Sequence, residues 1–308
     1  MIMEFHHIPV LLRDSIEALA VKPDGIYVDC TAGGGGHSEL ILKKLDKGKL
    51  VLIDRDPDAV KALSEKFGED GRVSIFNDNF SNIDAILHSL RIEKADGILA
   101  DLGVSSFQLD NPKRGFSFHT DAPLDMRMSK TGISAYDVVN TYTQDRLSRI
   151  IFSFGEEKYA GSIARNIVRQ RAIKPIETTL RLVEIIRNAM PKSALRGSHP
   201  ARRTFQAIRI EVNGELETLK NTLPLMFGQL CVGGVLAIIT FHSLEDRIVK
   251  DYFQTLSKGC TCPRDFPVCV CGGKPKARVK SRGVTSKEEE ISKNPRSRSA
   301  KLRTAVKL

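Results

Sequence analysis

One stretch near the N-terminus, IYVDCTAGGGGHS at residues 26–38, constrains the fold of this chain more than any other. A short apolar run ends in Asp29, four glycines follow, and His37 opens a segment with helically spaced leucine and isoleucine. Such a loop lets a ligand approach bare backbone, and the start of the following helix offers unpaired N–H groups to an anion. The stretch therefore predicts an α/β fold that binds a nucleotide-type ligand.

The spacing of the glycines separates two classes of ligand. The dinucleotide fingerprint G-x-G-x-x-G is incomplete in either register, because its last position falls on a residue other than glycine. The pattern acid-x-x-x-G-x-G of Rossmann-like S-adenosylmethionine (SAM) methyltransferases fits Asp29, Gly33 and Gly35. A further glycine that is frequent in those enzymes is replaced by His37. SAM is favoured, and a nicotinamide dinucleotide is retained as the alternative.

Strands and helices alternate through the first hundred residues. Apolar runs at 26–30, 49–54, 73–76 and 97–101 predict strands, and the segments 37–45, 57–67 and 82–90 between them predict helices. This order predicts a parallel, doubly wound sheet, preceded by an amphipathic helix at 8–20. Ligands bind such sheets at the carboxyl ends of the strands. The polar groups expected there are Asp29, Asp54, the NDNF turn at 77–80 and Asp101, and Asp54 suits a ribose diol.

The alternation stops after Asp101. Residues 102–130 resemble a loop, and helical periodicity then returns at 134–140, 143–153, 156–171 and 177–190. A connection of this length should carry its own structure. We predict an inserted helical domain at 107–206, basic enough to contact RNA phosphates, within a discontinuous domain formed by 1–106 and 207–308. A solvated basic helix face is the alternative reading of these charges.

The remainder of the chain should complete the sheet. Periodicity predicts one helix at 205–223, a strand at 233–241 and a further helix at 241–253 whose N-cap is Ser243. His242 should lie at a strand tip, as a base, as a substrate contact or as a hydrogen-bonded loop residue. The last run, KLRTAVKL, predicts an edge strand of the same sheet.

Composition narrows the partners and the compartment. The chain of 308 residues carries a net charge of +10, which favours a polyanionic partner such as nucleic acid, although a generally basic protein would share it. No apolar run is long enough for a membrane span, and the charged N-terminal segment is unlike a signal peptide. We therefore expect a cytoplasmic protein that has no membrane partner.

Four of the six cysteines lie close together in a C-x-C-x6-C-x-C segment, at Cys260, Cys262, Cys269 and Cys271. Four such thiols could hold zinc, but the usual spacing is C-x2-C. A cluster of reduced surface thiols is the alternative, and no metal site is predicted here.

Four long blocks together resemble one known family. They are DLGVSSFQLDNPKRGFSFHTDAPLDMRM (101–128), HPARRTFQAIRIEVNGEL (199–216), FHSLEDRIVK (241–250) and NPRSRSAKLR (294–303). The residues of these blocks and their order along the chain closely resemble those of the ribosomal RNA small subunit methyltransferase H family, also called MraW. The resemblance implies a class I SAM methyltransferase with a helical insertion. Its expected substrate is the exocyclic N4 of a cytidine in the decoding region of 16S rRNA, within the 30S subunit. The sequence leaves the oligomeric state open, a homodimer included.

The resemblance also implies contacts with SAM. Carried over by motif, these contacts are Gly35, Gly36, His37, Asp54, Phe80, Asp101 and Gln108, to which the glycine spacing adds Gly33. His37 is expected near the methionine carboxylate, and Phe80 is expected to pack on the adenine. Gln108 follows from the resemblance alone.

Asp101 is the predicted catalytic residue. The lone pair of a cytosine amine is delocalised into the ring, and a carboxylate that accepts its N–H groups favours a localised lone pair, while positioning near the methyl group supplies much of the rest. Many amino-methyltransferases place two prolines and an aromatic residue after this strand, and this chain has neither. The base would then stack elsewhere, with Phe107, Phe116 and Phe118 as candidates, unless they pack inside the insert.

Three other functions remain open from the sequence. An NAD-dependent oxidoreductase would need the complete dinucleotide spacing, which is absent. An RNA-binding ribosome-assembly factor that merely retains SAM would have less need of the intact loop and strand-tip acids. A DNA amino-methyltransferase is disfavoured by the missing prolines.

Overall fold

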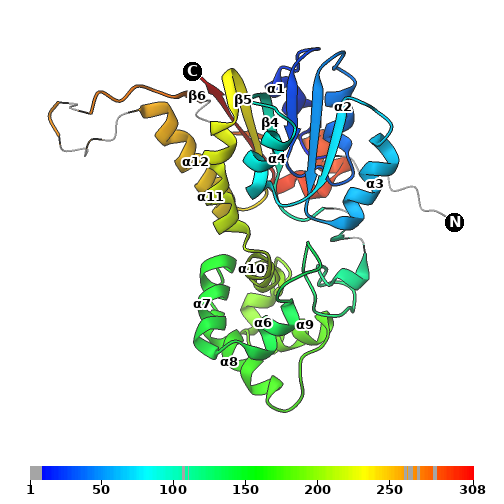
Figure 1. Ribbon diagram of the computed structural model, residues 1–308. Helices are drawn as coiled ribbons and strands as arrows, with labels where there is room; N and C mark the ends of the chain where they lie inside the picture. The colour runs from blue at the N-terminus through cyan, green and yellow to red at the C-terminus, as the bar shows by residue number, and fades with distance from the viewer. Residues whose placement is uncertain are drawn as a thin grey trace. The chain divides into compact units, whose positions relative to one another are not determined.

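The computed structural model describes residues 9–105, 108–109, 111–259, 262, 266–268, 271–279 and 283–308. The chain divides into two compact units, one formed by Met1–Gly103 with Leu216–Leu308 and the other by Val104–Glu215 (Figure 1). The expected boundary at 206–207 falls inside helix α10 (Arg202–Asn213), which belongs wholly to the second unit. In the described residues no helix is long and apolar enough to cross a membrane.

The first unit is built on one mixed sheet. Its strand order is β3-β2-β1-β4-β5-β8-β6, and β7 also pairs with β8. The first five are parallel to one another, namely β3 (Val73–Asn77), β2 (Lys49–Asp54), β1 (Ile26–Asp29), β4 (Ala95–Asp101) and β5 (Leu230–Thr240). This agrees with the parallel, doubly wound arrangement expected from the alternation of elements.

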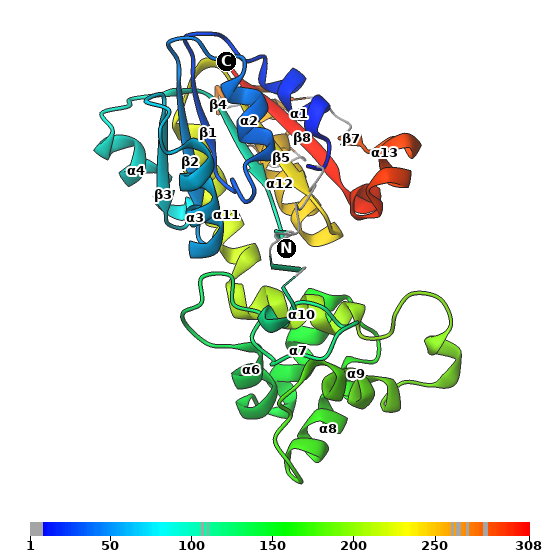
Figure 2. The ribbon, with the colours of Figure 1, turned by 90° about the vertical axis from the view of Figure 1, so that its right-hand side faces the viewer.

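The last strand is not at the edge of the sheet. β8 (Lys301–Lys307) pairs antiparallel with β5 on one side, and β6 (Ala277–Val279) and β7 (Val284–Thr285) pair with it on the other (Figure 2). The prediction of an edge strand was therefore wrong. The covering strands were missed because each is only two or three residues long and lies in a strongly basic segment.

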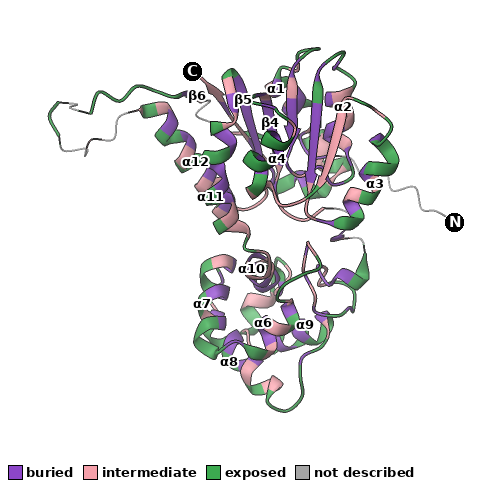
Figure 3. Ribbon diagram, in the orientation of Figure 1, coloured by how far each residue is buried: buried purple, intermediate pink, exposed green. Residues whose placement is uncertain are grey.

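Helices cover both faces of the sheet, because strand side chains alternate between the faces. On one face Val51, Ile53 and their neighbours pack against helices α4 (Ile83–Ser89), α11 (Glu215–Gly228) and α12 (Ser243–Lys258). On the other face, Leu50 and Leu52 pack against α1 (Leu12–Leu19), α2 (Gly36–Leu42) and α3 (Pro57–Phe67). Strands β1, β2, β4 and β5 are consequently buried along most of their length, whereas β3 at the edge of the sheet is only half-buried (Figure 3).

The second unit is helical and has a core of its own. Its elements are η2 (Pro112–Arg114), α6 (Ala135–Thr141), α7 (Gln144–Gly155), α8 (Ala160–Arg171), α9 (Thr179–Asn188), η3 (Lys192–Leu195) and α10. Helix α10 ends at Gly214, where φ is +60°, a value that favours glycine. The single helix expected at 205–223 is therefore two helices, α10 and α11.

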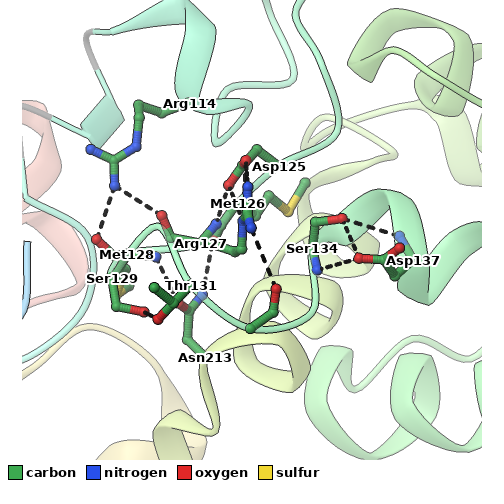
Figure 4. A network of polar contacts seen from close by, with 11 residues as sticks. Arg114, Asp125, Met126, Arg127, Met128, Ser129, Thr131, Ser134, Asp137 and Asn213 are labelled. Atoms are coloured by element: carbon green, nitrogen blue, oxygen red, sulfur yellow. Dashed lines mark hydrogen bonds and ion pairs between the residues drawn. The ribbon is translucent and has the colours of Figure 1, made fainter.

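The long loop before α6 is held by polar contacts with backbone (Figure 4). The buried Arg114 side chain donates from Nη2 to the carbonyl oxygens of Arg127 and Met128, at 2.8 and 3.0 Å. The Asn213 side chain accepts from the Met128 N–H at 2.9 Å and donates to the Met126 carbonyl at 2.8 Å. Arg114 thus holds the loop together internally, and Asn213 fixes it on α10.

Candidate cofactor and active site

The glycine loop is tied to the strand beside it. Gly33 and Gly35 have φ values of +50° and +73°, a left-handed conformation that glycine adopts without steric cost. The Gly33 N–H donates to Asp54 Oδ2 at 2.8 Å, and the Gly35 N–H closes a turn on the Ala32 carbonyl at 2.7 Å. The loop between β1 and α2 therefore has a defined shape, set in part by the acid at the tip of β2.

Two of the glycines are also required by packing. A Cβ at Gly35 would lie 2.5 Å from the Phe67 ring, and a Cβ at Gly36 would overlap the ring of Pro9. Close approach of a ligand was the reason expected for these glycines, but core side chains already need the space. Composition alone could not reveal this contact, because Pro9 and Phe67 are distant in the sequence.

Asp29 supports the loop from below. Its Oδ2 accepts a 2.6 Å hydrogen bond from the Ser38 hydroxyl, and its Oδ1 accepts from the Thr31 N–H at 3.2 Å. Burial raises the pKa of the Asp29 carboxyl to about 6, against the opposing effect of these two hydrogen bonds. Asp29 is 1% exposed, so its part in the site is to hold the loop.

Asp54 keeps acceptor capacity at the tip of β2. Its Oδ1 accepts from the Asp56 N–H at 2.8 Å, and its Oδ2 accepts from the Gly33 N–H. A carboxylate offers about four lone-pair positions, so each oxygen can accept a second hydrogen bond. Burial raises the pKa of Asp54, and the two backbone donors oppose that shift. Two hydroxyl donors of a ribose are compatible with this arrangement.

Phe80 begins the short η1 turn (Phe80–Asn82) beyond β3, and the turn before it is bound to β2. The Asp78 N–H and the Asn77 side-chain amide both donate to the Asp54 carbonyl, at 3.1 and 3.0 Å. The Phe80 ring is half-buried and packs on the core of the sheet. The structure therefore brings Gly33, Asp54 and the NDNF turn together at adjacent strand ends.

Asp101 ends β4 beside the glycine loop. Its backbone N–H donates to the Thr31 hydroxyl at 2.6 Å. Its Oδ2 lies 4.0 Å from His37 Nδ1, whereas its Oδ1 is shielded from solvent and has no hydrogen-bond partner among the described residues. Burial raises the pKa of Asp101 well above its usual range, and the carboxylates of Asp29 and Glu245 add to the shift.

His37 is the buried first-turn residue of α2. Its Nε2 lies 3.1 Å from the Val10 carbonyl oxygen, which can only accept, so Nε2 carries the proton. The ring thus lies between the backbone before α1 and the carboxyl of Asp101. Its proposed place near a methionine carboxylate stays a prediction.

Gln108 belongs to the helical unit. Its Oε1 accepts from the Ser105 N–H at 3.1 Å, and its side chain is buried. Of the predicted stacking residues, Phe107 lies outside the described residues, Phe116 is buried in the helical core, and Phe118 is partly exposed at the edge of that core.

The prediction that Ser243 caps α12 was wrong by one residue. His242 is the N-cap, and its Nδ1 accepts from the Glu245 N–H at 3.4 Å, while Glu245 Oε2 accepts from the His242 N–H at 3.3 Å. His242 Nε2 also lies 3.1 Å from Glu245 Oε1. Of the three roles considered for His242, that of a hydrogen-bonded residue therefore explains its position.

Two residues beside Asp101 were missed from the sequence. Thr31 binds its backbone, and Glu245, which is 2% exposed, raises its pKa. Placing the capping box one residue earlier in the FHSLEDR block, with its N-cap at His242, would have identified Glu245 as its partner. No signal would have identified Thr31.

The cysteine segment gives no metal site in the described part of the chain. Cys260 and Cys269 lie outside it, and of the two cysteines inside it Cys262 is half-buried and Cys271 is exposed. Within the residues that the structure describes, no group of three or more His, Cys, Asp or Glu side chains could hold a metal ion.

Comparison with known proteins gives matches over the full length. Ribosomal RNA small subunit methyltransferase H of Clostridium botulinum strain Kyoto is 54% identical, over 99% of this chain and 100% of its own length. The protein of that name from Clostridioides difficile strain 630 is 52% identical with the same coverage. A solved rRNA methylase from Streptococcus thermophilus is 14% identical with a TM-score of 0.43, covering 98% of this chain and 99% of its own. The sequence model of the MraW methylase family matches residues 4–308, and this chain belongs to that family.

Proposed function

We propose that this protein transfers a methyl group from SAM to the N4 amine of a cytidine in the decoding region of 16S rRNA. Family membership over residues 4–308 supports methyl transfer, and the names of relatives at 52–54% identity support the ribosomal substrate. The assembled 30S subunit in the cytoplasm is the proposed setting.

The strand tips fit SAM. Asp54 has lone pairs left for a ribose diol, and Gly34 of the glycine loop is exposed. Bound there, SAM would supply an electrophilic methyl group on a sulfonium cation. The proposed contacts are Gly33, Gly35, Gly36, His37, Asp54, Phe80, Asp101 and Gln108.

The observation that carries the mechanism is the carboxyl of Asp101. A buried acceptor without a partner costs free energy, so an incoming amine that donates to Oδ1 is favoured. The amine must meet a carboxylate rather than a neutral acid. Burial and two nearby acids favour the neutral form, and a cation placed beside Asp101 would favour the ionised form. Asp101 would thus be ready to accept an N–H only when the donor site is filled.

The test is tritium transfer from labelled SAM to purified 30S subunits and to free 16S rRNA, followed by nucleoside mapping. We expect label in N4-methylcytidine and a preference for the assembled subunit. Label in another nucleoside would contradict the proposed position. Binding of SAM without transfer to any RNA would instead favour the assembly-factor alternative, and transfer to competing DNA would favour a DNA amino-methyltransferase.

A further inference from the structure

A small aromatic cluster lies at the rim of the helical unit. Phe118 and His199 stack with ring centroids 4.5 Å apart and an angle of 17° between their planes. His119 lies 4.5 Å from Phe118 and 5.3 Å from His199. These three residues are called the imidazole platform below.

The platform is anchored on one side and open on the other. The Phe118 ring makes an edge contact with the buried Phe205, with centroids 5.7 Å apart, while His119 is exposed and His199 is half-buried. Packing of the core accounts for the Phe118–Phe205 contact. It does not account for two imidazoles gathered on the outer side, where polar rings gain little from covering an apolar surface.

The loop that carries His119 is held in place. Thr179 Oγ1 donates to the Thr120 carbonyl at 2.7 Å and accepts from the Ala122 N–H at 3.0 Å. The Asp121 carboxylate accepts from the Leu180 N–H at 3.1 Å, so the acid nearest to the platform in the chain is engaged with α9. A surface fixed in this way would lose little conformational entropy when a flat ligand stacks on it.

The surroundings of His199 favour the neutral form of its imidazole ring. Its Nδ1 accepts from the Ala201 N–H at 3.3 Å, which leaves the proton on Nε2. Burial lowers the pKa of His199, and the nearby His119 and Arg187 lower it further. A neutral imidazole can stack on a nucleobase without the cost of desolvating a charge.

Two exposed arginines lie close to this neutral surface. Arg187 is exposed, and its side chain makes no hydrogen bond or ion pair with any residue that the structure describes. Arg196 is exposed three residues before His199, a length of chain that spans about 10 Å at most. Aromatic faces flanked by cations are how proteins hold unpaired nucleotides, with bases on the rings and phosphates on the cations.

We infer that the imidazole platform is a stacking surface for unpaired bases of RNA, with Arg187 as a phosphate contact. The choice of RNA rests on the proposed function. The platform therefore sets the affinity for the RNA substrate.

The experiment compares a short single-stranded oligouridine with an abasic chain of equal length by fluorescence anisotropy on the full protein. Wild type should bind the oligouridine more tightly. His119→Ala should weaken binding of the oligouridine about 5- to 10-fold, the loss of roughly one stacked base, and leave the abasic chain unaffected. Arg187→Gln should weaken both and reduce the salt slope by about one.

Controls separate the platform from general effects. Phe152→Ala removes another aromatic side chain of the helical unit, one that is 65% exposed, and should leave both affinities unchanged. Phe118→Leu keeps apolar volume while removing the ring, and should act like His119→Ala.

Equal wild-type affinity for the two chains would overturn the inference, as would undiminished preference in His119→Ala. The inference would also be overturned, in favour of a protein contact, if His119→Ala lost binding to 30S subunits but kept its affinities for oligouridine and for the abasic chain. Methyl transfer to 30S subunits is measured in parallel. If no methyl group is transferred, the proposed function is refuted. The platform is still supported in that case if wild type binds oligouridine more tightly than the abasic chain and His119→Ala loses this difference.

Discussion

The strand tips of the first unit and the rim of the helical unit differ in how their polar groups are used. At the tips, Asp29 and Asp54 are buried or half-buried and accept hydrogen bonds from hydroxyl or backbone N–H groups. At the rim, Arg187 and His119 are exposed. The first arrangement suits a small ligand held in one geometry, whereas the second suits a large, flexible, negatively charged partner.

This difference predicts which substitutions should have large effects on chemistry and stability. A buried acceptor loses its partner without compensation by water, while water and salt compensate an exposed charge. Substitutions at the strand tips should therefore alter chemistry and stability, and those on helix surfaces should alter stability little.

The largest effect is expected for Asp101→Asn. An amide keeps the shape of the carboxyl but has one acceptor oxygen and no charge, so turnover should fall about 100- to 1,000-fold. SAM affinity by calorimetry should change far less if Asp101 acts on the amine. An equal loss of SAM affinity and turnover would show that the residue serves the cofactor alone.

A smaller effect concerns stability and pH. The pKa of Asp29 is raised from 3.8 to about 6 in the folded state, so the folded chain binds this proton more tightly than the unfolded chain. Stability should fall as pH rises from about 4 to 6, by about 3 kcal/mol for this group alone. Urea unfolding of wild type and Asp29→Asn across this range is the measurement. The decrease should be smaller in the variant, and parallel curves would contradict the assignment.

The smallest effect is expected on the helical unit. Arg181 and Glu184 form an ion pair on α9 at 2.5 Å, with side chains 44% and 57% exposed. Glu184→Gln should change the free energy of unfolding by less than about 0.5 kcal/mol. Ser38→Ala, which removes the buried 2.6 Å bond to Asp29, is the matched comparison and should cost about 1–2 kcal/mol. Similar changes in the free energy of unfolding for the two variants would contradict the distinction between the strand tips and the surface of the helical unit.

The repetitive part of the fold could be predicted from the sequence. Apolar periodicity located the parallel strands, and α3 was expected at 57–67 as observed, because Pro57 and the Asp56 cap mark its start. The acids at strand ends also followed, since parallel topology brings those ends to one edge.

Features that depend on long-range contacts could not be predicted. Nothing local indicates that β8 acquires β6 and β7 as partners, or that Pro9 fills the space above Gly36. Gly214 was present in the sequence, but an isolated glycine is also tolerated within a helix, so the break between α10 and α11 was missed. The stacking of His199 on Phe118 joins two segments 81 residues apart, beyond the reach of any spacing rule.

The backbone at residues 9–11 joins both ends of the sequence to the glycine loop. Pro9 lies against Gly36, the Val10 carbonyl binds His37, and the Leu11 N–H donates to Glu290 Oε1 at 2.7 Å. During translation, the glycine loop leaves the ribosome long before Glu290 and the residues of β8 exist. The proposed methyl-donor site therefore acquires its last supports only near the end of synthesis, and a nascent chain released early would hold the loop without them.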